Sequence, residues 1–190
     1  PLFQGTRRLA DVTAGHTFYL EEMGVKTGDA VSYYARATDA AGGKDRVTSS
    51  DLYFVRVRPF KKDFRAAQSM AGGGGGGMGG GAGDVTALSE QQRQVISATF
   101  NVQRDRKTFT ADKLKQNSIV VGLSQSRLRE QVEGLVTRMT SRFISPDPAF
   151  KKITDLLPRA IAEMKVAEEK LNAVSPDAAL PAEHRAHAVR

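Results

Sequence analysis

The sequence predicts a mixed, segregated fold: an antiparallel β-segment, a flexible glycine-rich linker, and then an antiparallel helical array. Three observations predict this fold. Apolar and polar residues alternate with a period of two in 30–38 and 51–59, as in strands covered on one side only. Apolar residues recur at helical spacing from about residue 95 onward. Between the two patterns, residues 71–83 hold ten of the chain's 18 glycines.

The first 60 residues are expected to form at least three strands, at about 17–20, 30–38 and 51–59. Val31 and Tyr33 share an apolar face in the second strand, and Val55 lies on the corresponding face of the third. Three strands with one apolar face need a second sheet, so we expect a partial β-sandwich. Without that sheet the segment would expose Phe18, Val31, Tyr33 and Val55.

The strings GVKTGD, AVSYYARATDAAGG and SSDLYFVRVRP resemble the last three strands of an immunoglobulin-like or fibronectin-like module. Tyr33 or Tyr34, shortly after Gly28 and Asp29, stands where such folds place a tyrosine corner. The resemblance covers about residues 12–59 and implies a fold without implying a ligand.

The polar face of the same strands combines aromatic and basic residues, and we treat it as a candidate interaction face. Arginine beside an aromatic ring can bind acidic partners or nucleic acid. The alternative, which we favour, is an ordinary solvated sheet face. The candidate residues are Tyr34, Arg36, Phe54, Arg56 and Arg58.

Residues 61–85 are expected to be a flexible linker, because glycine loses the most conformational freedom on folding and has no side chain to bury. The 13-residue run would span about 20 Å on average. It is not a phosphate-binding loop, since Asp84 and Val85 follow the last glycine where such a loop needs Lys and Ser or Thr.

Residues 86–190 are expected to be helical, with helices at about 89–107, 111–144 and 148–173 and another starting at 181. Pro158 should kink or split the third helix. Seven-residue spacing in the second helix is typical of a coiled-coil-like seam, which is more often core than a partner-binding groove. The packing stripe consists of Leu114, Val121, Leu128, Val132, Leu135, Met139 and Phe143.

The sequence offers no catalytic, cofactor-binding or metal-binding motif, so we expect no enzyme activity, no cofactor and no small-molecule ligand. His184 and His187 would need a third ligand to hold zinc.

The net charge of +7 comes from dispersed residues, which makes nucleic acid an unfavoured partner. The chain has no cysteine, which excludes disulfides. No apolar run approaches the roughly 20 residues of a membrane span.

The chain opens with Pro1 and closes in what looks like a starting helix, so we expect an interior part of a longer protein. The join of GHTFYLEEMGVKTGDAVSYYARATD, DLYFVRVRPF, a glycine run and LSEQQRQVISATFNVQRDR resembles large bacterial membrane-anchored envelope proteins of unknown function. This resemblance implies an extracytoplasmic setting, with the membrane reached only through segments outside this chain. A cytoplasmic location is the alternative.

The leading functional hypothesis is a non-enzymatic structural or interaction segment of such an envelope protein. Its partners would be other proteins, the remainder of the parent chain, or a second copy through the helices. The alternative is a basic helical nucleic-acid-binding protein, whose binding would weaken steeply with salt. The third hypothesis is an accessory region of an enzyme whose active site lies outside this chain.

Overall fold

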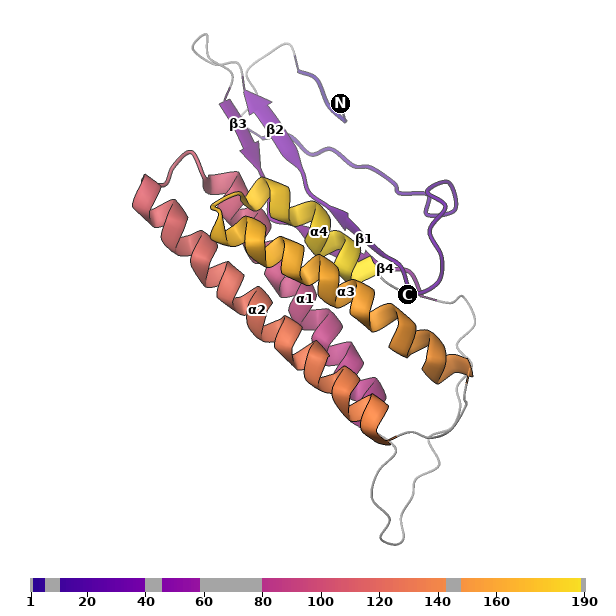
Figure 1. Ribbon diagram of the computed structural model, residues 1–190. Coiled ribbons are helices and arrows are strands. Elements are labelled where there is room, and N and C mark those ends of the chain that lie inside the picture. The colour runs from indigo at the N-terminus through magenta and orange to yellow at the C-terminus, as the bar shows by residue number, and fades with distance from the viewer. Residues whose placement is uncertain (1, 6–10, 40–45, 59–79, 143–147, 189–190) are drawn as a thin grey trace, which may run out of the picture.

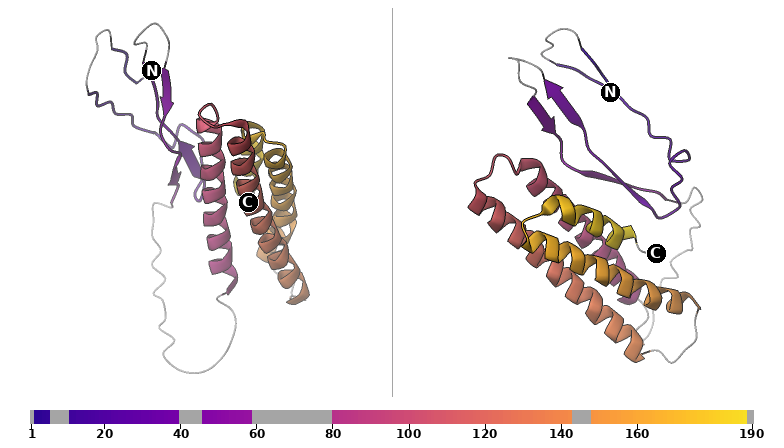
Figure 2. Two further views of the ribbon diagram at one scale, coloured as in Figure 1. Left: turned by 90° about the vertical axis from the view of Figure 1, so that its left-hand side faces the viewer. Right: turned by 45° about the horizontal axis from the view of Figure 1, so that its top comes forward.

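The computed structural model describes residues 2–5, 11–39, 46–58, 80–142 and 148–188, which form an antiparallel ribbon beside a four-helix bundle (Figure 1). The strands are β1 (Ala30–Tyr33), β2 (Arg36–Asp39), β3 (Arg46–Ser49) and β4 (Tyr53–Arg56). The helices are α1 (Gly80–Asp105), α2 (Ala111–Arg142), α3 (Pro148–Asn172) and α4 (Pro176–Ala188). Helices α1 and α3 each pack against both α2 and α4, so the four helices close a ring. Figure 2 shows the ribbon lying on the α1 side of this bundle.

The predicted immunoglobulin- or fibronectin-like sandwich is wrong. Among the described residues there are two small two-stranded sheets, β1–β4 and β2–β3, and no second layer of sheet. Residues 17–19 form no strand and 20–24 are a turn, whereas β3 was not expected at all. The physical reason is that alternation defines two strand faces without deciding which one is packed. Here the face that carries Tyr34 meets α1, and no second sheet covers the face of Val31 and Tyr33 among the described residues.

The two sheets are successive parts of one ribbon, offset by a bulge. Tyr33 pairs with Tyr53 at the end of the β1–β4 ladder. Further along, the backbone amide of Ser50 donates to the carbonyl of Ala35 at 2.8 Å. One residue on the first strand therefore lies opposite two on the second, which is the count of a β-bulge and bends the ribbon locally.

Local signals define the helix ends. The Thr110 hydroxyl accepts a hydrogen bond from the Lys113 amide at 3.3 Å and caps α2. At the end of α3, Val174 has a φ of 56°. The Ser175 amide donates to the carbonyl of Lys170, and the Val174 amide to that of Leu171, both at 2.9 Å. These are the two bonds of a Schellman motif, although Val174 stands where glycine is usual.

The helix ends differ from those expected. Helix α1 begins at Gly80, so residues 80–85 of the expected linker are helical, and residues 61–79 lie outside the described part of the chain. Helix α3 continues through Pro158 without splitting. Helix α4 begins at Pro176, because proline suits the first helical position, where its missing N–H leaves no bond unmade.

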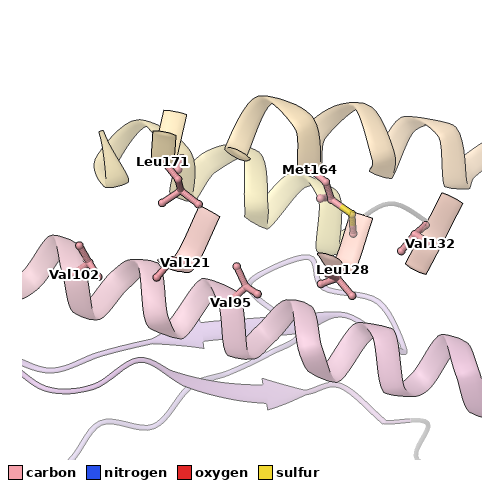
Figure 3. Close-up of a cluster of buried hydrophobic side chains, with 9 residues drawn as sticks. Val95, Val102, Val121, Leu128, Val132, Met164 and Leu171 are labelled. Carbon is pink, nitrogen blue, oxygen red and sulfur yellow. The ribbon is translucent and has the colours of Figure 1, made fainter. Parts of the chain in front are cut away.

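The core of the bundle is an apolar cluster contributed by all four helices. Its labelled members in Figure 3 are Val95, Val102, Val121, Leu128, Val132, Met164 and Leu171. Gly122 permits the close approach of α2 and α3, since an added Cβ would stand 3.4 Å from Leu171 Cβ and 3.0 Å from Asn172 Oδ1. No helix in the described part of the chain combines the length and the hydropathy needed to cross a membrane.

Candidate functional site

The ribbon has one face turned to the helices, and strand β4 runs along α1. Asp51 Oδ1, just before β4, lies 2.5 Å from Nη1 of Arg104. At the far end of β4, the positive charge of Arg56 adds to burial in lowering the pKa of Arg93 on α1. Five strand residues and eleven helix residues both span about 17 Å. The stretch 51–56 of the ribbon can therefore run alongside the stretch 93–104 of α1 from end to end.

Tyr34 completes this contact between ribbon and bundle. Its ring centroid lies 4.9 Å from that of Phe100 on α1. Arg104 of α1 donates hydrogen bonds to Asp105 and Asp51, and these bonds raise the pKa of Arg104. The same bond to Arg104 lowers the pKa of Asp105. Such an exposed ion pair contributes little free energy, so the aromatic contact accounts for more of the attachment.

The structure places the candidate interaction face partly against this helix. Tyr34 touches α1 yet is 49% exposed, and Phe54 is half-buried. Arg36, Arg56 and Arg58 are all exposed, and the charge of Arg56 reaches α1 closely enough to lower the pKa of Arg93. The five residues thus divide between the contact with α1 and solvent. Their part in binding a partner stays a prediction.

The opposite side of the ribbon carries a connected row of aromatic rings. The centroids of Phe18 and Tyr33 are 5.5 Å apart, and those of Tyr33 and Tyr53 are 5.6 Å apart and stacked. His16 meets Phe18 edge-on at 4.9 Å. The side chains of Phe18, Tyr33, Tyr53 and Val55 are 44%, 37%, 51% and 36% exposed. We call these four residues the aromatic face.

Two open hollows adjoin the ribbon. One, of about 550 Å³, is lined by residues 15–19 together with Glu22 and Met23, next to the aromatic face. The other, of about 360 Å³, lies between the ribbon and the bundle, where Tyr34, Phe100 and Leu180 meet the polar side chains of Gln103 and His184. The titratable side chains among the lining residues are His16, Tyr19 and Glu22 in the first hollow and Tyr34, Asp177 and His184 in the second.

The bundle encloses polar side chains that the apolar pattern did not reveal. Gln92 and Gln125 are 2% and 0% exposed, and their amides exchange two hydrogen bonds at 3.1 and 3.2 Å. Because α1 and α2 are antiparallel, two turns further along each helix Thr99 stands at the level of Ser118, and both are fully buried. The seven-residue spacing of 92 and 99, and of 118 and 125, is the signal that could have found them.

Among the described residues of the bundle, Glu183 on α4 is the only ionisable residue that is fully buried. The Thr99 hydroxyl donates a hydrogen bond of 2.6 Å to Glu183 Oε1, while Oε2 is buried without a partner. Burial raises the pKa of this carboxyl to about 8, and the Thr99 bond opposes that rise. The side chain is therefore mainly neutral at pH 7. Sequence inspection did not single it out.

Most of the expected packing stripe faces the interior. Val121, Leu128, Val132 and Leu135 are buried, and Leu114 and Met139 are half-buried. Phe143 lies outside the described residues. Helix α2 packs against α1 and α3, and these side chains lie on that side of it, so its outer surface is formed by other residues.

Two histidines, His184 and His187, lie on α4. No group of three potential metal ligands occurs among the residues described. The His187 Nε2 atom lies 3.3 Å from Ser89 Oγ, and burial lowers the pKa of His184. A serine and a histidine at this separation could act together as nucleophile and base. Neither residue lines either of the two hollows described above.

Comparison with protein families, curated proteins and solved structures finds no match to this chain. The geometry therefore has to be interpreted from its own residues. It offers an exposed aromatic surface on a small ribbon, a support of four helices, and a polar group buried within them.

Proposed function

We propose that this chain is a non-enzymatic interaction segment, in which the helical bundle supports the ribbon and the aromatic face binds another protein. The observation that supports this is the unequal treatment of the two ribbon faces. On the inner face Phe54 is half-buried and the Tyr34 ring meets Phe100 of α1, whereas, among the described residues, the rings of Phe18, Tyr33 and Tyr53 meet only rings of the segment 16–53 and these residues are 37–51% exposed.

The chemistry of the aromatic face favours a β-layer as its partner. The outward positions of β1 and β4 are Val31, Tyr33, Tyr53 and Val55, and none carries a charge. A flat, uncharged, aromatic surface suits the apolar side of another strand pair, and a two-stranded sheet gains stability from such a layer. Tyrosine adds large contact area and a hydroxyl at low entropic cost, as in many protein interfaces.

The setting we propose is a larger envelope-associated bacterial protein on the extracytoplasmic side of a membrane. This rests on the resemblance in the order of β-segment, glycine run and helices. The β-layer that covers the aromatic face would then belong to a second envelope protein or to the remainder of the parent chain. Both sources share the same surface chemistry.

Site-specific photocrosslinking tests the proposal. A benzophenone amino acid would replace Tyr53, 51% exposed, in cells that make the protein. The matched control position is Leu123 on α2, which is 55% exposed on a different part of the molecule. We expect a discrete protein adduct from position 53, reduced when Tyr33→Ser accompanies the probe, and none from position 123. No adduct at 53, or the same adducts at both positions, would overturn the proposal.

A further inference from the structure

Helix α4 is the shortest helix of the bundle, and most of its buried residues are alanine. It has 13 residues, against 26, 32 and 25 in α1, α2 and α3. Its buried residues are Pro176, Ala179, Ala182, Glu183 and Ala186. Alanine buries a single methyl group, so α4 gains much less hydrophobic stabilisation than the other helices, which bury valine, leucine and methionine.

The largest buried side chain of α4 is thus a carboxyl group in an interface that supplies it with one donor. Thr99 provides that donor to Oε1, and Oε2 has none. A carboxylate withdrawn from water needs several donors or a cation to compensate its lost hydration. A neutral carboxyl needs far less. The surroundings of Glu183 therefore suit the protonated form.

Among the described residues, no cation influences the pKa of Glu183. On α3, Glu163 forms an ion pair with Arg185 at 2.9 Å, on the exposed side of α4. On α1, Arg93 pairs with Glu90. His184 is beside Glu183 in sequence, but burial lowers the pKa of His184 and so favours its uncharged form. The influences on the pKa of Glu183 are burial and the Thr99 hydroxyl alone.

The other groups near α4 are uncharged or lie at its exposed start. Helix α2 contributes buried Ser118 and Gln125, neither of which titrates. The hollow beside the ribbon brings Tyr34 and Ser32 toward α4, together with the exposed Asp177 of α4 itself. A second acidic group there cannot stabilise a carboxylate.

We propose that α4 is a proton-controlled latch, docked on α1 and α3 while the Glu183 carboxyl is protonated and released when it ionises. On release the carboxyl gives its proton to water and becomes hydrated, and α4 leaves the groove between α1 and α3. The apolar cluster that Ala179 and Ala186 help to cover, including Val95 and Met164, then becomes accessible. This device is independent of the aromatic face.

Hydrogen–deuterium exchange of the full chain, corrected for the pH dependence of intrinsic exchange, tests the latch. The pKa of about 8 in the docked helix, against the ordinary 4.5, implies that opening of α4 rises about 30-fold between about pH 6.5 and about pH 9. We expect that loss of protection in 176–188. Glu183→Gln, which cannot ionise, should remove the pH dependence. The matched control Glu169→Gln, exposed on α3, should retain it.

Unchanged protection of α4 across this pH range in the unmodified chain would overturn the latch, and so would an equal loss in Glu183→Gln. If that variant fails to fold, the carboxyl carbon of Glu183 can be titrated by nuclear magnetic resonance in the unmodified chain. A midpoint above about pH 7 supports the latch, and a midpoint near the ordinary value for glutamate refutes it.

Discussion

The buried pair of Gln92 and Gln125 makes a sharp prediction about how polar groups behave inside this bundle. Their two reciprocal hydrogen bonds, at 3.1 and 3.2 Å, satisfy both amides away from water. Gln92→Leu removes both bonds and leaves the amide of Gln125 buried and unpaired. The lost bonds and the unpaired amide together cost about 3 kcal/mol, at the upper end for a buried unsatisfied group, and the added apolar side chain recovers about 1 kcal/mol. We expect each single variant to be destabilised by about 2 kcal/mol.

The double variant, with leucine at both positions, leaves no orphaned group and should lie within about 1 kcal/mol of the unmodified protein. The two changes are thus strongly non-additive, with a coupling of about 3 kcal/mol. The measurement is denaturant unfolding followed by far-ultraviolet circular dichroism. Leucine at the exposed Gln91 and Gln131 serves as a control and should show no coupling. A double variant destabilised by the sum of the two singles would refute the reasoning.

Three further predictions concern backbone and charge. Gly134→Ala should raise stability by about 1 kcal/mol, because an added Cβ meets nothing within 4 Å, and Gly122→Ala should gain clearly less in the same thermal melts. Val174→Gly should stabilise by about 1 kcal/mol in chemical denaturation, since it relieves a β-branched residue at a φ of 56°. Glu183 has a raised pKa in the folded state, so the folded state holds the proton longer and stability falls as pH rises from about 4.5 to about 8. The slope is about 1.4 kcal/mol per pH unit, and Glu183→Gln should abolish it. Parallel pH profiles for the two proteins would contradict the assignment of this slope to Glu183.

The sequence was most informative where structure depends on near neighbours. Seven-residue spacing placed Val121, Leu128 and Leu135 on one side of α2, and these residues are buried. Alternation placed Val31 and Tyr33 on one face of a strand, and the register of β1 with β4 keeps them on one face. Both patterns follow from the repeat of a single helix or strand, which is fixed by local backbone geometry.

It was least informative about which surface covers which. The sandwich prediction assumed that Val31, Tyr33 and Val55 would meet a second sheet. The structure instead turns the other face, with Tyr34, toward Phe100 of α1. A strand's alternation defines two faces without saying which one is covered, because the covering element comes from a distant part of the chain.

The polar contacts inside the bundle show the same division. By itself the sequence determined that 86–190 can form amphipathic helices and that the chain has no cysteine with which to form disulfides. Only the tertiary structure decided that Gln92 meets Gln125, that Thr99 meets Glu183, and that this carboxyl is withheld from water. Glutamine, threonine and glutamate are ordinary surface residues in a sequence, and the partners that they bond here lie 33 and 84 positions away in the chain. The loss of water that raises the pKa of Glu183, and that makes an unpaired amide costly, arises only when the helices pack around these side chains.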